Sequence, residues 1–198
     1  MKAADIDVKM RILLAAKKLF AAQGFDRTSV RQICEEAGAN VALISYYFGG
    51  KDNLFFALFE AFFPSRGIAS IAKDMDPLEG MKLIIRELLT FRDEDAELSY
   101  IIQHEFALNT PRIAMIQERV LPLWQLIYQW LLKGREQGVF EFNSVHTVFK
   151  AVSSTLLFPK GNNHMLVLMG DDVSTLEEQI SETTAFIFKA LKPSEQVE

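Results

Sequence analysis

The chain has 198 residues, of which 49% are hydrophobic, and its formal net charge is −5. This composition can supply a packed core and excludes a disordered chain. The longest apolar stretches are interrupted well before the roughly 18 residues that a membrane-spanning helix needs, and no signal peptide is visible, so we expect a cytoplasmic protein without a membrane partner.

The first predicted element is an amphipathic helix that ends at Gly24. Ile12, Ala16 and Phe20 recur at helical spacing on one face, and Lys9 lies away from that face. Glycine often follows the last turn of a helix because it adopts positive φ without strain. We expect this helix to close the core of a small N-terminal domain.

Two short helical patterns follow, and Gly38 separates them. The first is predicted over 29–36, with Thr28 as the N-cap, because its hydroxyl can accept from a free backbone N–H. The second is predicted over 41–47, with Asn40 as its cap. Seven helical residues span roughly 10 Å, which is comparable with a DNA major groove about 12 Å wide. The pattern is therefore typical of a helix-turn-helix whose second helix reads DNA.

Spacing within the second helix divides its residues into two groups. Val41, Ile44 and Phe48 recur at intervals of three and four and are expected to face inward. The residues expected to point elsewhere are Asn40, Ala42, Ser45, Tyr46 and Tyr47. A tyrosine hydroxyl can donate to a phosphate oxygen, and asparagine or serine can reach base edges. From spacing alone, a second interpretation stays open, in which the two tyrosines are partly buried in a helical corner.

The stretch from Met10 to Phe59 carries several further features in a fixed order. These are a first helix ending in Phe20 and Gly24-Phe25, the Thr28 cap, the Ala37-Gly38 turn, and the pattern Tyr46-x-Phe48-x-x-Lys51. In these features the stretch resembles the N-terminal domain of the TetR family of transcriptional regulators. The resemblance implies a homodimer that binds a double-stranded DNA operator, usually as a repressor. It also implies a variable C-terminal domain that binds a small-molecule effector.

The resemblance further implies which residues contact DNA. Thr28, Ser29 and Arg31 match phosphate-contacting positions, and Lys51 matches a phosphate-contacting lysine. The recognition helix is matched by Asn40, Val41, Ala42, Ser45, Tyr46 and Tyr47. Tyr47 stands where many members have histidine, and Ser45 where many have tyrosine. The operator sequence is therefore not implied.

The charge is divided unevenly along the chain. Residues 1–62 hold eight Lys or Arg against seven Asp or Glu, a net charge of +1, and the remainder holds 13 against 19, a net charge of −6. Because the first segment is only weakly basic, its affinity for DNA must depend on a few well-placed contacts made twice by a dimer. We expect that affinity to fall as salt rises.

The next pattern, over 52–63, is apolar nearly all round, which predicts a connector helix covered on both sides. Pro64, Ser65 and Gly67 interrupt it. We therefore divide the chain into a DNA-binding domain, 1–63, and an effector-binding and dimerisation domain, 64–198.

Helical patterns continue through the second domain, and no convincing strand alternation occurs. The predicted helices cover 78–92, 95–109, 111–137, 144–158 and 175–191. Pro122 should kink or split the third of these. Ser174 with Glu177 should form a capping box for the last. The predicted fold class is all-α.

Two helices of this domain carry apolar stripes that suit an intersubunit four-helix bundle. The stripe residues are Val148, Val152, Thr155 and Leu156 on one helix, and Ile180, Thr184, Ile187 and Leu191 on the other. Pattern alone leaves open that these stripes face the protomer's own core. The family resemblance favours pairing.

The second domain is also rich in aromatic residues, which suits a pocket for a largely apolar or aromatic effector. The candidate pocket residues are Gln103, His104, Phe106, Trp124, Tyr128 and Phe149. Most aromatic residues of the domain are expected to be core, and Glu105 is a further polar anchor for a ligand.

Motifs that would indicate an enzyme are absent. There is no Glu-x-x-His pair, HExxH, GxSxG or phosphate-binding GxxxxGK[ST], so we expect no catalytic site, metal or cofactor. The single cysteine, Cys34, is interpreted as a small core residue, with a reactive thiol as the alternative. The competing function is a helical ligand-binding or interaction protein that does not bind DNA.

Overall fold

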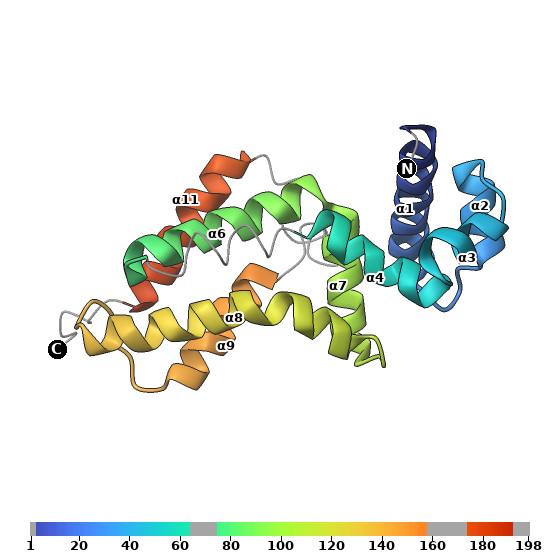
Figure 1. Ribbon diagram of the computed structural model, residues 1–198. Helices are drawn as coiled ribbons and strands as arrows, with labels where there is room; N and C mark the ends of the chain where they lie inside the picture. The colour runs from blue at the N-terminus through green and yellow to red at the C-terminus, as the bar shows by residue number, and fades with distance from the viewer. Residues whose placement is uncertain (1–2, 64–74, 158–173, 192–198) are drawn as a thin grey trace. The chain divides into compact units, whose positions relative to one another are not determined.

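The computed structural model describes residues 3–63, 75–157 and 174–191, and all regular structure in these ranges is helical (Figure 1). The helices are α1 Ala3–Gln23, α2 Val30–Ala37, α3 Ala42–Phe48, α4 Lys51–Phe62, α6 Pro77–Glu94, α7 Ala96–Leu108, α8 Ile113–Glu136, α9 Val145–Leu157 and α11 Leu176–Leu191. The predicted all-α class is confirmed, and each predicted helix is present within two residues of its expected bounds.

The chain divides into two compact units. The first comprises residues 1–63 and 97–117, and the second comprises 64–96 and 118–198. The first unit thus contains almost all of α7 and the start of α8, whereas the predicted division placed both segments in the C-terminal domain. Pro64, Ser65 and Gly67, on which the predicted boundary rested, lie outside the described residues. The functional division at residue 63 stays a prediction.

The first unit is held together by an apolar core that α1, α2, α3, α4 and α7 share. Its buried members include Ile12, Ala16, Phe20, Ile33, Ile44, Phe48, Leu54, Phe55, Leu58 and Ile101. The rings of Phe20, Phe25 and Phe55 meet pairwise at 5.2 to 5.6 Å between centroids, within the range of favourable aromatic contact. This core fixes the two short helices α2 and α3 on α1 and α4.

In the second unit, α6 lies alongside α11 (Figure 1). Arg86 of α6 makes two hydrogen bonds to the carboxylate of Glu177 of α11, of 2.6 and 3.0 Å. The side chain of Trp130 from α8 packs on the backbone of α6 at Gly80, where a Cβ would lie 2.4 Å from the indole ring. α8 is not split at Pro122 but continues as one helix from Ile113 to Glu136.

Two predicted caps are wrong by one residue. Ser29, not Thr28, caps α2, because Ser29 Oγ accepts from Gln32 N–H while Gln32 Oε1 accepts from Ser29 N–H. Likewise Thr175 with Glu178, not Ser174 with Glu177, forms the capping box of α11. The side chains that were expected to cap are engaged elsewhere. Thr28 is buried with its hydroxyl on the carbonyl of Gly24, and Glu177 binds Arg86.

The predicted dimer stripe is wrong for most of its members. Val152, Leu156, Ile180, Ile187 and Leu191 are buried within the single chain, so their side chains face the protomer's own core. Val148, Thr155 and Thr184 are half-buried. The apolar spacing located a real inward face but did not identify what covers it.

Within the described residues, none of the helices combines the length and apolar character needed to span a bilayer. In the same ranges, no group of three or more His, Cys, Asp or Glu side chains is placed to hold a metal ion.

Candidate nucleic-acid interface

Two neighbouring hydroxyl residues, Thr28 and Ser29, precede α2, and the first is buried whereas the second is exposed. Thr28 is 1% exposed, and its Oγ1 donates to the carbonyl of Gly24 at 2.8 Å and accepts from Gln23 Nε2 at 3.1 Å. Ser29 is exposed at the N-terminus of α2. The side chain of Thr28 therefore holds the α1–α2 corner and is not available to a phosphate, whereas Ser29 is exposed, with its Oγ engaged in the cap with Gln32.

The turn between α2 and α3 has the geometry that the sequence predicted. Gly38 has φ 59° and ψ 42°, and the N–H groups of Gly38 and Ala39 donate to the carbonyls of Glu35 and Cys34. Asn40 Oδ1 accepts from the N–H of Ala42 at 2.9 Å, so its predicted capping role is confirmed. Glycine is required at the turn because the left-handed conformation is strained for other residues.

Helix α3 has one buried face and one exposed face. Ile44 and Phe48 are 1% and 8% exposed, whereas Tyr46 is 79% exposed. Ala42 and Ser45 are also exposed, and Tyr47 is half-buried with its ring 5.0 Å from that of Tyr46 between centroids. The interpretation that both tyrosines belong to the core is therefore wrong for Tyr46.

Val41 differs from the prediction. It was expected to face inward with Ile44, but its side chain is 49% exposed. Val41 has helical backbone angles, φ −54° and ψ −35°, but it stands at the very start of α3, where its side chain is left uncovered. The exposed residues of α3 and of the segment before it are therefore Asn40, Val41, Ala42, Ser45 and Tyr46. On α2, the side chain of Arg31 is 84% exposed and pairs with Glu35.

Lys51 begins α4, but its ammonium group is not freely extended into solvent. Nζ lies 4.0 Å from the centroid of the Phe25 ring, a cation–π contact, and the side chain is half-buried. Burial is the largest cause that lowers the pKa of Lys51, and the charge of Arg112 lowers it further, while Asp26 and Asp52 act in the opposite direction. The lysine is thus anchored on an aromatic ring at the N-terminus of α4.

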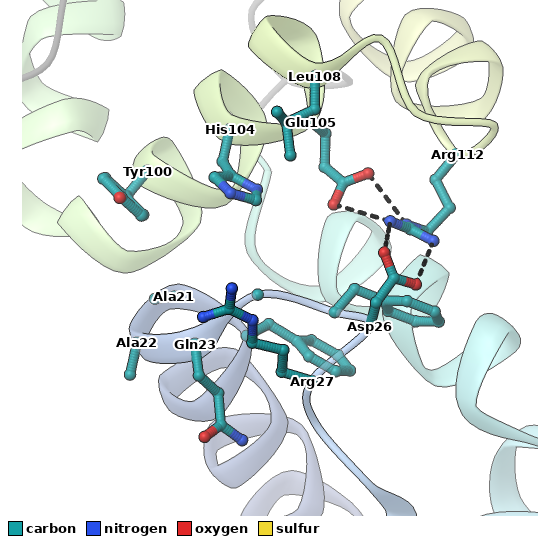
Figure 2. Close-up of a pocket in the computed structure, with 13 residues that line it drawn as sticks. Ala21, Ala22, Gln23, Asp26, Arg27, Tyr100, His104, Glu105, Leu108 and Arg112 are labelled. Carbon is teal, nitrogen blue, oxygen red and sulfur yellow. Dashed lines mark hydrogen bonds and ion pairs between the residues drawn. The ribbon is translucent and has the colours of Figure 1, made fainter.

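A polar cluster that sequence reasoning missed joins three separate segments of the first unit (Figure 2). Arg112 donates from Nε to the buried carboxylate of Glu105 at 3.0 Å and from its terminal nitrogens to Asp26 at 3.3 Å. Thr110 donates its hydroxyl to Glu105 as well. The guanidinium carbon of Arg112 lies 4.1 Å from the centroid of Phe25. Because 86 residues separate Asp26 from Arg112, no local spacing indicates their contact.

The six predicted effector residues are distributed over the two units. Gln103, His104 and Phe106 lie in the first unit, and Trp124, Tyr128 and Phe149 in the second. In the second unit, the ring of Phe149 lies 6.3 Å from that of Trp124 and 5.5 Å from that of Tyr128, in edge-to-face arrangements. All three are half-buried. Glu105, the further polar anchor, is instead buried against Arg112.

Comparison with known proteins gives consistent matches. Residues 12–58 match a family model described as bacterial regulatory proteins, tetR family. The chain is similar to the probable HTH-type transcriptional regulator YttP of Bacillus subtilis, with 28% identity over 137 residues, 67% of this chain and 66% of that one. It is also similar to the HTH-type transcriptional repressor NicS of Pseudomonas putida, with 36% identity over 80 residues, 40% of this chain and 37% of that one.

Among solved structures, the fold is similar to that of a HlyIIR mutant protein that carries a linker substitution. The two chains are 26% identical, with a TM-score of 0.78, and the match covers 96% of this chain and 100% of the other. The family-model match thus contains α2 and α3, whereas the structural match extends over both units.

Proposed function

The chain belongs to the TetR family of bacterial regulatory proteins, and we propose that it is a DNA-binding transcriptional regulator whose helix α3 lies in the major groove. The observation that carries this proposal is the 79% exposure of Tyr46 on a helix whose opposite face is buried. A large aromatic residue at such a position gains little from folding and has a phenol group that can donate to DNA. It would act in the cytoplasm, where the DNA lies.

Contacts to the phosphates would flank this helix. Ser29 and Arg31 stand at the start of α2, where free backbone N–H groups also favour a phosphate. Lys51 stands at the start of α4. Asn40, Ala42, Ser45 and Tyr46 would face the bases, and Tyr47 would contact the backbone from the edge of α3. Thr28 is omitted because its side chain is buried.

We further propose that the protein acts as a homodimer. Each DNA-binding domain is only weakly basic, and a dimer with two recognition helices at a fixed separation would make every DNA contact twice. The pairing surface would be formed by the faces of α9 and α11 that stay exposed. Phe186 of α11 is 65% exposed, with Ala190 on the same face, and Ala151 of α9 is exposed one turn from Val148. Small residues around one exposed ring suit close helix packing between subunits.

The regulator would be a repressor that a small, largely apolar or aromatic effector releases from its operator. The half-buried rings of Trp124, Tyr128 and Phe149 support this proposal, because they form an aromatic cluster that is not closed to solvent. A ligand can shift the protein away from DNA only by the difference between its affinities for the two arrangements.

The direct test is the affinity of the full-length protein for DNA fragments from its own locus, measured by fluorescence anisotropy. Tyr46→Ala should weaken binding about tenfold or more, as expected for loss of one well-placed contact per half-site in a dimer. Leu14→Ala is the matched control, because Leu14 is also a large exposed residue of the first unit but lies on α1. Thermal unfolding should be the same for both variants within about 0.5 kcal/mol.

Two results would oppose the proposal. If the wild-type protein retards no fragment from its locus at low salt, the competing function, a helical ligand-binding or interaction protein, is favoured. If Tyr46→Ala binds every fragment as the wild type does, α3 is not the reading helix.

A further inference from the structure

A hollow of about 350 Å³ lies in the first unit, between the C-terminal end of α1 and helix α7 (Figure 2). Tyr100, His104 and Leu108 line it from α7, and their spacing of four residues places them on one helical face. The other side is formed by the segment 20–27. All of these residues belong to one compact unit, and the volume falls at the lower end of the range for small-molecule sites, about 300 to 1,000 Å³.

The acidic groups at the edge of this hollow already have partners. Glu105 is 2% exposed and accepts hydrogen bonds from Arg112 and Thr110. Asp26 accepts two from the same guanidinium. Arg112 thus binds both carboxylates, and Asp26 also attracts the ammonium group of Lys51, so that two cations offset the two negative charges and the pair offers little to a cationic ligand.

Two basic groups in the hollow, Arg27 and His104, lack such partners within the described residues. Figure 2 shows the guanidinium of Arg27 directed into the space between α1 and His104. Within the described part of the chain, Arg27 makes no hydrogen bond or ion pair, and the imidazole of His104 makes only a ring stack with Tyr100, at 6.2 Å between centroids. The planar donors of Arg27 suit a carboxylate, which can accept two of them at once.

Apolar surface lies next to these two bases. Tyr100 is 51% exposed and Leu108 is 62% exposed, although both are large and line the hollow. The ring of Phe20 and the methyl groups of Ala21 and Ala22 line the same space from α1. A ligand that covers this surface gains from the removal of apolar area from water.

We propose that this hollow binds a small organic acid, with its carboxylate on Arg27 and His104 and its apolar body between Tyr100, Leu108 and the end of α1. Arg27 and His104 together can hold one carboxylate, so the site suits a monoacid better than a polyanion. It is separate from the aromatic cluster of the second unit, and it does not depend on DNA binding.

The test uses the full chain and a matched pair of probes, 3-phenylpropanoate and its neutral amide, 3-phenylpropanamide. Isothermal titration should detect saturable binding of the acid and at least tenfold weaker binding of the amide. Arg27→Gln should weaken binding of the acid at least tenfold, and Arg135→Gln, which removes an exposed arginine of the second unit, should leave it unchanged. Inorganic phosphate should compete poorly with the acid.

The position of the bound acid can be read from histidine side chains, because the chain has only three of them. In ¹H–¹³C spectra of histidine-labelled protein, the acid should shift the ring signal that His104→Gln removes. Phe149→Ala, in the second unit, should not change that shift. The ring of His146 lies 6.1 Å from that of Tyr128 in the aromatic cluster of the second unit. The proposal is overturned if the acid does not bind at millimolar concentration, if Arg27→Gln binds it as the wild type does, or if the His146 signal moves in place of that of His104. Loss of DNA binding, measured separately, would leave these outcomes unaffected.

Discussion

Arg112 holds the carboxylate of Glu105 at 3.0 Å, and the two side chains are 12% and 2% exposed. The pair joins α7 to the segment before α8, and through Asp26 it extends to the segment between α1 and α2. The hydrogen bonds to Glu105 and Asp26 raise the pKa of Arg112, although burial is the largest cause and acts to lower it. The guanidinium therefore stays charged.

Glu105→Gln should destabilise the protein by about 2 to 4 kcal/mol, because a buried cation loses its nearest counter-charge. The matched control is Glu79→Gln. Glu79 pairs with Lys82 at the surface, where both side chains are about half exposed, so its loss should cost less than about 0.5 kcal/mol. Urea unfolding of both variants measures the difference, and equal midpoints would show that the buried pair contributes no net stability.

Gly80→Ala should also destabilise the fold, although alanine favours a helix by about 1 kcal/mol. The new Cβ would lie 2.4 Å from the ring of Trp130, which is 3% exposed and cannot move aside freely. Overpacking of this kind costs about 1 to 3 kcal/mol and should prevail. The double variant Gly80→Ala with Trp130→Phe should recover part of the loss in thermal unfolding. A stable single variant would mean that α6 and α8 can separate at little cost.

Cys34 should be protected from alkylation in the folded protein. It is 2% exposed, and burial raises the pKa of its thiol, so the thiolate that reacts is scarce at pH 8. Iodoacetamide labelling followed by mass spectrometry should be at least about a hundredfold faster in urea than in buffer. Rapid labelling of the native protein would favour the alternative interpretation of Cys34 as a thiol sensor.

Phe186→Arg should shift the proposed homodimer to monomer, because an exposed apolar ring at a subunit contact would be replaced by a charge. Light scattering at micromolar concentration measures the mass. Leu121→Arg is the control, since Leu121 is 48% exposed in the same unit but lies on α8. If both variants keep the mass of the wild type, the pairing surface lies elsewhere.

Much of the helical framework could be predicted from local pattern. The spacing of Ile12, Ala16 and Phe20 and the position of Gly38 depend on residues within one or two turns, and the structure places them as expected. It is harder to predict which of two adjacent residues caps a helix, because Thr28 and Ser29 are both good capping residues. The choice between them depends on the burial of Thr28, whose hydroxyl donates to the carbonyl of Gly24 after the end of α1.

Long-range relationships were not accessible in this way. Apolar spacing at Ile180 and Ile187 identifies an inward face, but the same pattern suits a partner subunit or the chain's own core. Local spacing in the sequence gives no indication that Arg112 contacts Asp26. Likewise, the hollow at Arg27 exists only because α7 packs beside the end of α1.

The two faces of α3 have a consequence for protein engineering. Ile44 and Phe48 anchor the helix, and Gly49 and Gly50, with φ of 74° and 138°, carry the chain into α4. Ala42, Ser45 and Tyr46 project from the opposite side and contribute little to cohesion of the unit. A library randomised at these three positions alone should therefore yield mostly folded variants, from which altered binding preferences can be selected.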